Sequence, residues 1–172
     1  MATCLIVIKG HFDDNDFDGV ETWYDYLKSV RALMEPQAYN MVLSVKFIQS
    51  KLNEIDSILA EMKKNEVKPT VDTYYIMLSG YAMRAENEKV ESTLKTMITE
   101  NVSLRDVVQH VEKYEGKKTA ESFEKLVKNP EKLGKEQPSP KKLVSVFDEN
   151  WEKLVEDPEG VSFPFLGHIF HI

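Results

Sequence analysis

The chain has 172 residues, a formal net charge of -7 and a single cysteine, Cys4. This length suffices for one domain with a substantial core, and seven glycines and seven prolines favour long helices over a turn-rich β fold. The negative charge is opposite to the usual footprint of nucleic-acid binders, and one cysteine excludes an internal disulfide framework. No segment has the roughly 18 apolar residues that a membrane span needs, and the first residues do not resemble a targeting peptide.

The first 105 residues are expected to form three helix pairs, because the sequence repeats with a period of 35 residues. The blocks 1–35, 36–70 and 71–105 align without insertion or deletion, and their apolar residues recur at helical spacings of three and four. The expected first helices cover 1–12, 36–47 and 71–82, and the expected second helices cover 17–28, 52–63 and 87–98. Because one helix pair cannot bury its apolar face alone, the predicted fold class is an all-α solenoid of helix-turn-helix repeats.

The acidic segment DDNDFDG, residues 13–19, separates the expected helices of the first block. With Asp25 it resembles an EF-hand calcium loop, which has carboxylates at regular positions and a glycine at position six. However, Glu21 stands where that loop has an aliphatic residue, and no second loop is present to pair with it. The period places the segment in a turn, with Asp18 as the N-cap of the second helix and Glu21 completing a capping box. We therefore expect a turn and no metal site.

Block two, PQAYNMVLSVKFIQSKLNEIDSILAEMKKNEVKPT, resembles the pentatricopeptide repeat family. The resemblance rests on a tyrosine that opens the first helix, a methionine near the end of the second, and a lysine-proline before the next block. Block one is more divergent, with Cys4 at the tyrosine position and Leu33-Met34 at the lysine-proline. Tetratricopeptide repeats, whose period is 34, are the nearest alternative.

The resemblance implies a groove that binds single-stranded RNA, with one base read by each repeat, and a mitochondrial location. The residue after the tyrosine and the last residue of each block would form a base-reading pair. The implied RNA-binding pairs are Leu5 with Glu35, Asn40 with Thr70, and Tyr75 with Arg105. The second pair resembles a family pair and would favour a pyrimidine, whereas Leu5 cannot hydrogen-bond to a base edge.

Neighbouring positions in the expected groove suit a protein partner better than RNA. Where the family often has a lysine that meets phosphate, this chain has Asp13, Ile48 and Met83. Apolar side chains here indicate either protein docking or packing between helices, and the sequence leaves both alternatives open. The docking candidates in the groove are Phe12, Phe47, Ile48 and Met83.

The period ends after residue 105. Residues 106–129 are expected to form a shortened capping helix pair joined through Gly116-Lys117-Lys118, and residues 130–138 an exposed linker. Residues 139–157 are expected to form an amphipathic helix, which either packs on the repeats or docks to a partner.

Residues 158–172 form an almost wholly apolar tail, which we expect to be buried against the chain itself or a partner. His168 and His171 lack a third ligand, so they do not indicate a zinc site. The docking candidates in the helix and the tail are Phe147, Trp151, Phe163, Phe165 and Phe170.

No catalytic grouping is recognisable: the chain lacks a phosphate-binding glycine loop, an HExxH motif, a CxxC pair and a nucleophile with a base. We therefore predict a non-enzymatic protein without a cofactor or a small-molecule substrate. The favoured function is a docking or scaffold subunit of a ribonucleoprotein assembly in organellar gene expression, such as a mitochondrial ribosome or a transcript-handling complex. Its expected partners are protein subunits.

The alternative function is a single-stranded RNA-binding protein that reads organellar transcripts through its groove. Three repeats would contact only about three nucleotides, which favours the docking role. Because block one begins at Met1 with no capping helix, we expect that further repeats precede it or that another chain covers this end. The sequence leaves the partner, the transcript and the choice between mitochondrion and plastid open.

Overall fold

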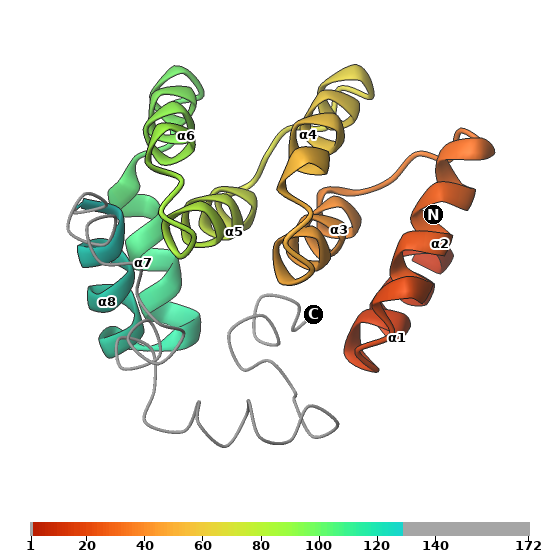
Figure 1. Ribbon diagram of the computed structural model, residues 1–172, viewed down its shortest axis with the longest axis horizontal. Coiled ribbons are helices and arrows are strands. Elements are labelled where there is room, and N and C mark those ends of the chain that lie inside the picture. Colours follow the sequence, from red (N-terminus) through yellow and green to blue (C-terminus); the bar gives the residue numbers. More distant parts are fainter. Residues whose placement is uncertain (1, 129–172) are drawn as a thin grey trace. The chain divides into compact units, whose positions relative to one another are not determined.

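The computed structural model describes residues 2–128, with side chains from residue 5 onward, and this part of the chain is all-α (Figure 1). Its helices are α1 (Ala2–Asp13), α2 (Phe17–Ser29), α3 (Pro36–Ile48), α4 (Ile55–Lys64), α5 (Val71–Ala82), α6 (Asn87–Thr99), α7 (Leu104–Glu115) and α8 (Lys117–Lys128), with a short 3-10 helix η1 (Leu52–Glu54) before α4. The linker, the amphipathic helix and the apolar tail predicted after residue 129 lie outside the described residues.

The helices predicted for the first 105 residues are present, and their bounds agree with the prediction to within one residue. The exception is the first turn of the helix predicted at 52–63, which is the 3-10 helix η1. There the amide of Glu54 donates to the carbonyl of Lys51, an i to i+3 bond that is common at helix starts.

The chain divides into two compact units, with the boundary between Ile76 and Met77 inside α5. In the first unit α1 packs against α2, α3 packs against both α1 and α2, and α4 packs against α3. In the second unit α7 packs against α8. The pairs α1 with α2, α3 with α4, and α7 with α8 therefore pack as neighbours joined by short connections, the local arrangement of helical repeats.

The turns between helices recur at the same period as the sequence. Residues with positive φ near 55° are Asn15, Ser50 and Ala85, and again Arg31, Glu66 and Asn101, so both sets are spaced by 35. After the second helices, the amides of Ala32, Val67 and Val102 each donate to a carbonyl five residues earlier at 2.9 Å. A left-handed residue with such a bond is the Schellman arrangement, which satisfies carbonyls at a helix end.

The acidic segment contains the turn between α1 and α2, residues 14–16, as predicted, but its capping residue was predicted wrongly. Asp16 is the N-cap of α2, and its carboxylate accepts a hydrogen bond from the amide of Gly19 at 2.9 Å. The same carboxylate lies 2.7 Å from Nδ1 of His11. Asp18 lies instead in the first turn of α2, because the left-handed Asn15 reverses the chain two residues earlier than expected. Glu21 therefore belongs to no capping box.

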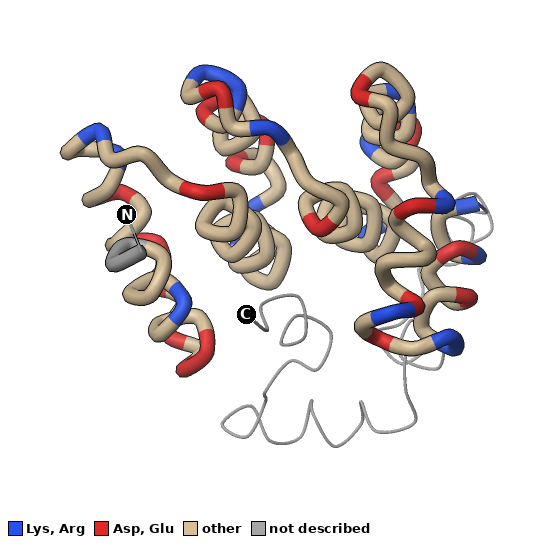
Figure 2. The backbone as a smooth tube through the Cα atoms, turned by 180° about the vertical axis from the view of Figure 1, so that it is seen from behind, with Lys and Arg blue, Asp and Glu red and all other residues tan. Residues whose placement is uncertain are grey.

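The core of the first unit is centred on α3. All ten residues from Ala38 to Phe47 are buried, and Lys46 is the one charged side chain among them. A helix that is apolar nearly all round is a core helix. In contrast, α2, α4 and α6 alternate buried apolar residues with exposed charged ones, which Figure 2 shows as blue and red along their backbones.

The last described helix pair is joined more tightly than predicted. Ser103 and Asp106 form a capping box that starts α7, with Ser103 accepting from the amide of Asp106 and Asp106 accepting from the amide of Ser103. Gly116 alone makes the turn, with a φ of 91° that favours glycine, and α8 already begins at Lys117. The connection between the two helices was predicted to span Gly116-Lys117-Lys118, so that prediction was two residues too long.

Candidate functional site

One of the implied base-reading pairs is brought together by the fold. Asn40 lies on α3 and Thr70 directly precedes α5, and Nδ2 of Asn40 lies 3.4 Å from Oγ1 of Thr70. The hydroxyl of Thr73 donates to Oδ1 of Asn40 at 2.7 Å. Asn40 is buried, so both ends of its amide are bonded inside the protein.

The two threonines of this cluster also start α5. The amide of Thr70 donates to Oγ1 of Thr73 at 2.9 Å, and the amide of Thr73 donates to Oγ1 of Thr70 at 3.3 Å. Such reciprocal bonds satisfy amides at a helix start, as in a capping box. The hydroxyls and the amide of Asn40 thus already serve the fold, and a base edge would compete with these bonds.

The other two implied pairs are placed differently. Leu5 is half-buried on α1, and Glu35 is an exposed residue at the N-cap of α3. Tyr75 is buried in α5 and belongs to the first unit, whereas Arg105 is exposed in the first turn of α7 in the second unit. Their role in RNA binding remains a prediction.

The docking candidates predicted in the groove are mostly covered. Phe12 and Phe47 are buried, and Ile48 and Met83 are half-buried. The ring of Phe12 lies 6.4 Å from that of Phe17 at the start of α2. Of the two alternatives left open by the sequence, packing accounts for the burial of the two phenylalanines. The candidates Phe147, Trp151, Phe163, Phe165 and Phe170 lie outside the described residues.

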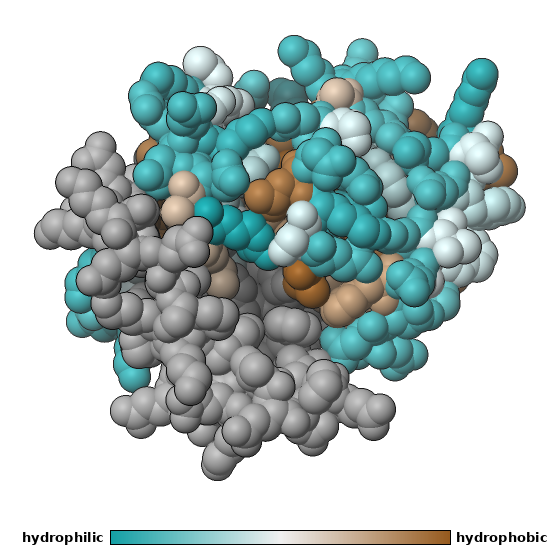
Figure 3. All heavy atoms as spheres, viewed as in Figure 1, coloured by the Kyte–Doolittle hydropathy of each residue, from teal (hydrophilic) through white to brown (hydrophobic). Residues whose placement is uncertain are grey.

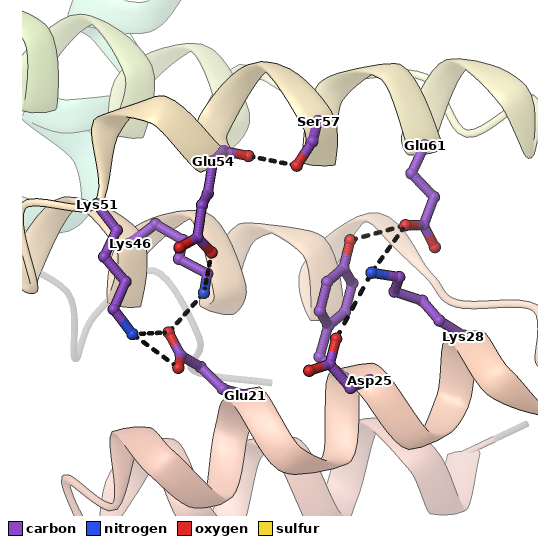
Figure 4. A network of polar contacts seen from close by, with 9 residues as sticks. Glu21, Asp25, Lys28, Lys46, Lys51, Glu54, Ser57 and Glu61 are labelled. Atoms are coloured by element: carbon purple, nitrogen blue, oxygen red, sulfur yellow. Dashed lines mark hydrogen bonds and ion pairs between the residues drawn. The ribbon is translucent and has the colours of Figure 1, made fainter.

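An ion-pair network that sequence reasoning missed joins α2 to α3 and η1 (Figure 4). Nζ of Lys46 lies 2.6 Å from a carboxylate oxygen of Glu21 and 2.6 Å from one of Glu54. Nζ of Lys51 donates to both oxygens of Glu21 at 2.9 Å. Two lysines and two glutamates thus neutralise one another, and the side chain of Lys46 is only 9% exposed. We name these four residues the Lys46 network.

The charges in the Lys46 network stabilise one another. Burial by itself would raise the pKa of Glu21, but the hydrogen bonds from Lys46 and Lys51 outweigh burial and lower it. Burial would likewise lower the pKa of Lys46, yet its bonds to Glu21 and Glu54 raise it. Lys46 is the single charge in an otherwise apolar helix, and that isolation is the sequence signal for a buried partner.

A second polar contact joins α2 to α4. The hydroxyl of Tyr24 donates to Glu61 at 3.1 Å, and Nζ of Lys28 lies 3.8 Å from the same carboxylate (Figure 4). Burial, followed by the charge of Glu61, raises the pKa of Tyr24. The ring of Tyr24 also meets that of Tyr39 edge-on, with centroids 6.2 Å apart. The first two helix pairs are therefore joined a second time, through Tyr24 and Lys28 on α2 and Glu61 on α4.

The described surface offers little concentrated positive charge. In the view of Figure 3 it is mainly hydrophilic with scattered apolar side chains, and Figure 2 shows acidic and basic residues interspersed. No group of three or more His, Cys, Asp or Glu side chains is placed to hold a metal ion within residues that the structure describes. Among the described helices, none is long and apolar enough to cross a membrane.

Residues 37–83 match the PPR repeat family, and this region includes α3, α4 and α5. No curated protein matches the chain. Proteins of this family are generally non-catalytic, bind RNA or proteins, and are commonly organellar. The match does not establish the number of repeats, which stays a prediction. The match over residues 37–83 supports a pentatricopeptide repeat protein, and the described helices agree with an all-α helical-repeat solenoid.

Proposed function

We propose that this protein is a non-catalytic docking subunit of an organellar, specifically mitochondrial, ribonucleoprotein assembly, and that its repeats hold protein partners. The observation that carries the proposal is the neutral Lys46 network. Lys46 and Lys51 are the basic residues of α3 and the turn that follows it, and both are bound to Glu21. The 35-residue spacing of the left-handed turn residues supports three repeats over residues 1–105.

Electrostatics argue against RNA as the main ligand. Affinity for nucleic acid comes largely from lysine and arginine contacts to phosphate, which release counterions. A lysine already paired with a buried carboxylate gains little from phosphate, because it must first give up that partner. With a net charge of -7, the chain also repels a polyanion as a whole.

A second candidate function, single-stranded RNA binding, is favoured by one specific observation. Asn40 and Thr70 lie within 3.4 Å of each other, so the pair implied by family resemblance is assembled at one place. If a pyrimidine entered there, the amide of Asn40 would exchange its bond to Thr73 for one to the base edge.

Fluorescence anisotropy of the full-length chain with pyrimidine-rich and purine-rich single-stranded RNA, at low and moderate salt, tests both candidates. The docking function predicts no binding in the micromolar range under either condition. The RNA alternative predicts micromolar, salt-dependent binding with a preference for pyrimidines.

Two matched variants make the result specific to the base-reading pair. Asn40→Asp changes the amide that would read the base, and Asn53→Asp makes the same charge change at an exposed position in η1. RNA binding that is lost in the first variant and kept in the second would overturn the docking function. Thermal unfolding of both variants, followed by circular dichroism, shows that each is folded under the binding conditions.

A further inference from the structure

The first helix pair leaves an apolar face uncovered. Ile6 on α1 is 66% exposed, and Tyr26 and Val30 on α2 are about half exposed. Trp23 is half-buried beside Tyr26, and their rings meet edge-on at 5.4 Å. Residues 23, 26 and 30 are spaced by three and four, so they share one side of α2. We name Ile6, Trp23, Tyr26 and Val30 the open face.

Described helices of the first unit cover the first helix pair on one side only. Figures 1 and 2 show α3 and α4 along one side of α1 and α2, and no described helix of the first unit along the other side. Exposed apolar groups that cluster on one side of a small helical unit mark an interaction surface.

The 35-residue period relates the open face to equivalent positions in the second block. One period after Ile6, Trp23 and Tyr26 stand Met41, Ile58 and Glu61. Met41 and Ile58 are 1% and 2% exposed. Glu61 contacts Tyr24 and Lys28 of the preceding helix pair. The open face therefore occupies the positions that the second helix pair uses to pack against the first.

The third block repeats this burial. Ile76 and Thr93, one period after Met41 and Ile58, are also buried. Both positions are thus buried in blocks two and three, whereas in the first block Ile6 is 66% exposed and Trp23 is half-buried. In the second block, α3, which carries Met41, packs on both α1 and α2, and Glu61 of α4 accepts a hydrogen bond from Tyr24 of α2. The second pair thus meets an antiparallel helix pair on this side.

The chemistry of the open face differs from that of the internal interface. The positions of Lys46, Lys51 and Glu54 are taken in the first block by His11, Asp16 and Gly19, and Tyr26 replaces Glu61. His11 and Asp16 bond to each other, so they do not offer the charges that the Lys46 network uses. The open face needs an uncharged apolar cover, and a polyanion such as RNA does not provide one.

We propose that the open face docks an antiparallel pair of α-helices from a partner protein, which presents an uncharged apolar side and packs as α1 and α2 pack on α3. This inference deepens the proposed docking function and rests on it, but it does not depend on the groove around Asn40. RNA binding around Asn40 and docking at the open face can therefore be tested and refuted independently of each other.

A fusion of the full-length chain to a further helix pair tests the proposal. A copy of residues 36–70 is placed before Met1, so that its final Thr70 leads into α1 as it normally leads into α5. In this copy Leu59 stands where the first block has Tyr24, and Asp56→Asn and Lys63→Gln remove the charges at the positions of Glu21 and Lys28, so the added block presents the uncharged side that the proposal requires. Trp151→Phe in the fusion and in the unfused chain leaves Trp23 as the single tryptophan and thus as a probe of the open face.

Docking predicts that, in the fusion, Trp23 emission moves to shorter wavelength, its quenching by acrylamide falls and the thermal midpoint rises. The matched control carries Ile6→Glu and Tyr26→Glu, which place charges on the open face and should abolish all three changes. Because both side chains are exposed, the unfused control should keep its helical content.

Two results would overturn the proposal. In the first, Trp23 stays as accessible in the fusion as in the unfused chain, whether or not circular dichroism shows that the added block is helical. In the second, sedimentation shows that the unfused chain self-associates while Trp23 becomes protected. The occupant would then be a second copy of this chain rather than a partner's helix pair.

Discussion

Neutralising Glu21 tests whether burial gives the Lys46 network its energetic value. In Glu21→Gln the side chain keeps its shape but loses its charge. Lys46 then retains one carboxylate partner, Glu54 at 2.6 Å, while Lys51 loses the carboxylate that it contacts at 2.9 Å. Since Lys46 is only 9% exposed, water cannot fully replace the lost charge.

The expected magnitude lies between two limits. Removing one partner of a fully buried ion pair costs about 3–5 kcal/mol, whereas an exposed pair contributes about 0–1 kcal/mol. Lys46 is buried but keeps Glu54, and the side chain of Glu21 is partly exposed. We therefore expect Glu21→Gln to lower the free energy of unfolding by about 1–2 kcal/mol.

The matched control is Glu91→Gln on α6. Glu91 lies 2.6 Å from Lys95, the same distance that separates Glu21 from Lys46, but the side chains of both Glu91 and Lys95 are largely exposed. Its loss should leave the free energy of unfolding nearly unchanged, because solvent screens an exposed ion pair. Urea unfolding is followed by circular dichroism for all helices and by Trp23 fluorescence, in a Trp151→Phe chain, for the first helix pair.

Equal losses of unfolding free energy in Glu21→Gln and Glu91→Gln would refute the reasoning. The distance between the charges, rather than their burial, would then determine how much the ion pair stabilises the fold. A further check comes from the position of the network. Since it joins the first and second helix pairs, Glu21→Gln should shift the Trp23 transition at least as much as the circular dichroism transition.

Three further predictions concern helix ends and a buried acid. Asp16→Ala should cost about 1 kcal/mol in urea unfolding because it removes the N-cap of α2, whereas Asp18→Ala should cost less than half as much. Ser103→Ala removes one side of the capping box of α7 and should cost about 1 kcal/mol in the same assay, and an unchanged midpoint would contradict the assigned cap. Burial raises the pKa of Glu115 to about 7 from 4.5, so native stability falls as pH rises from about 4.5 to about 7 and is constant above. Glu115→Gln should thus raise the thermal midpoint at pH 8 by the equivalent of about 1–3 kcal/mol but change it little at pH 4.5, while the exposed Glu112→Gln should be neutral at both.

Local patterns in the sequence were sufficient to predict the helices. The 35-residue period and the spacing of apolar residues depend on neighbours within one helix pair, so the bounds of α1 to α6 agree with the prediction to within one residue, except that the first turn predicted for α4 is the 3-10 helix η1. The turn in the acidic segment was also predicted correctly, because the period placed this segment between two helices and residues 14–16 join α1 to α2. The choice of Asp18 over Asp16 failed because both are good capping residues, and the left-handed Asn15 that precedes both leaves no clear signal in the sequence.

Contacts between helix pairs were not predictable in the same way. Glu21 and Lys46 are 25 residues apart, and Tyr24 and Glu61 are 37 apart. Glu21 and Glu61 each resemble an ordinary solvated residue when their own helix is considered alone, and Lys46 stands out only as the single charge of α3. The roles of Phe12 and Phe47 were also ambiguous, since an apolar residue that docks to a partner and one that packs between helices give the same pattern along the chain. Their burial became visible only when the helices were packed.

The sequence by itself determined the repeat, the helices and the family to which residues 37–83 belong, because these follow from short-range periodicity and from residue types at regular spacing. The tertiary structure alone decided which polar groups are already used: it bonds Asn40 to Thr73, pairs Lys46 with Glu21, and leaves Ile6 open while Met41 is buried. The physical reason is that equivalent positions in a repeat share backbone geometry but not neighbours. Burial and pairing depend on what packs against each helix pair, and this is set by contacts far apart in the sequence.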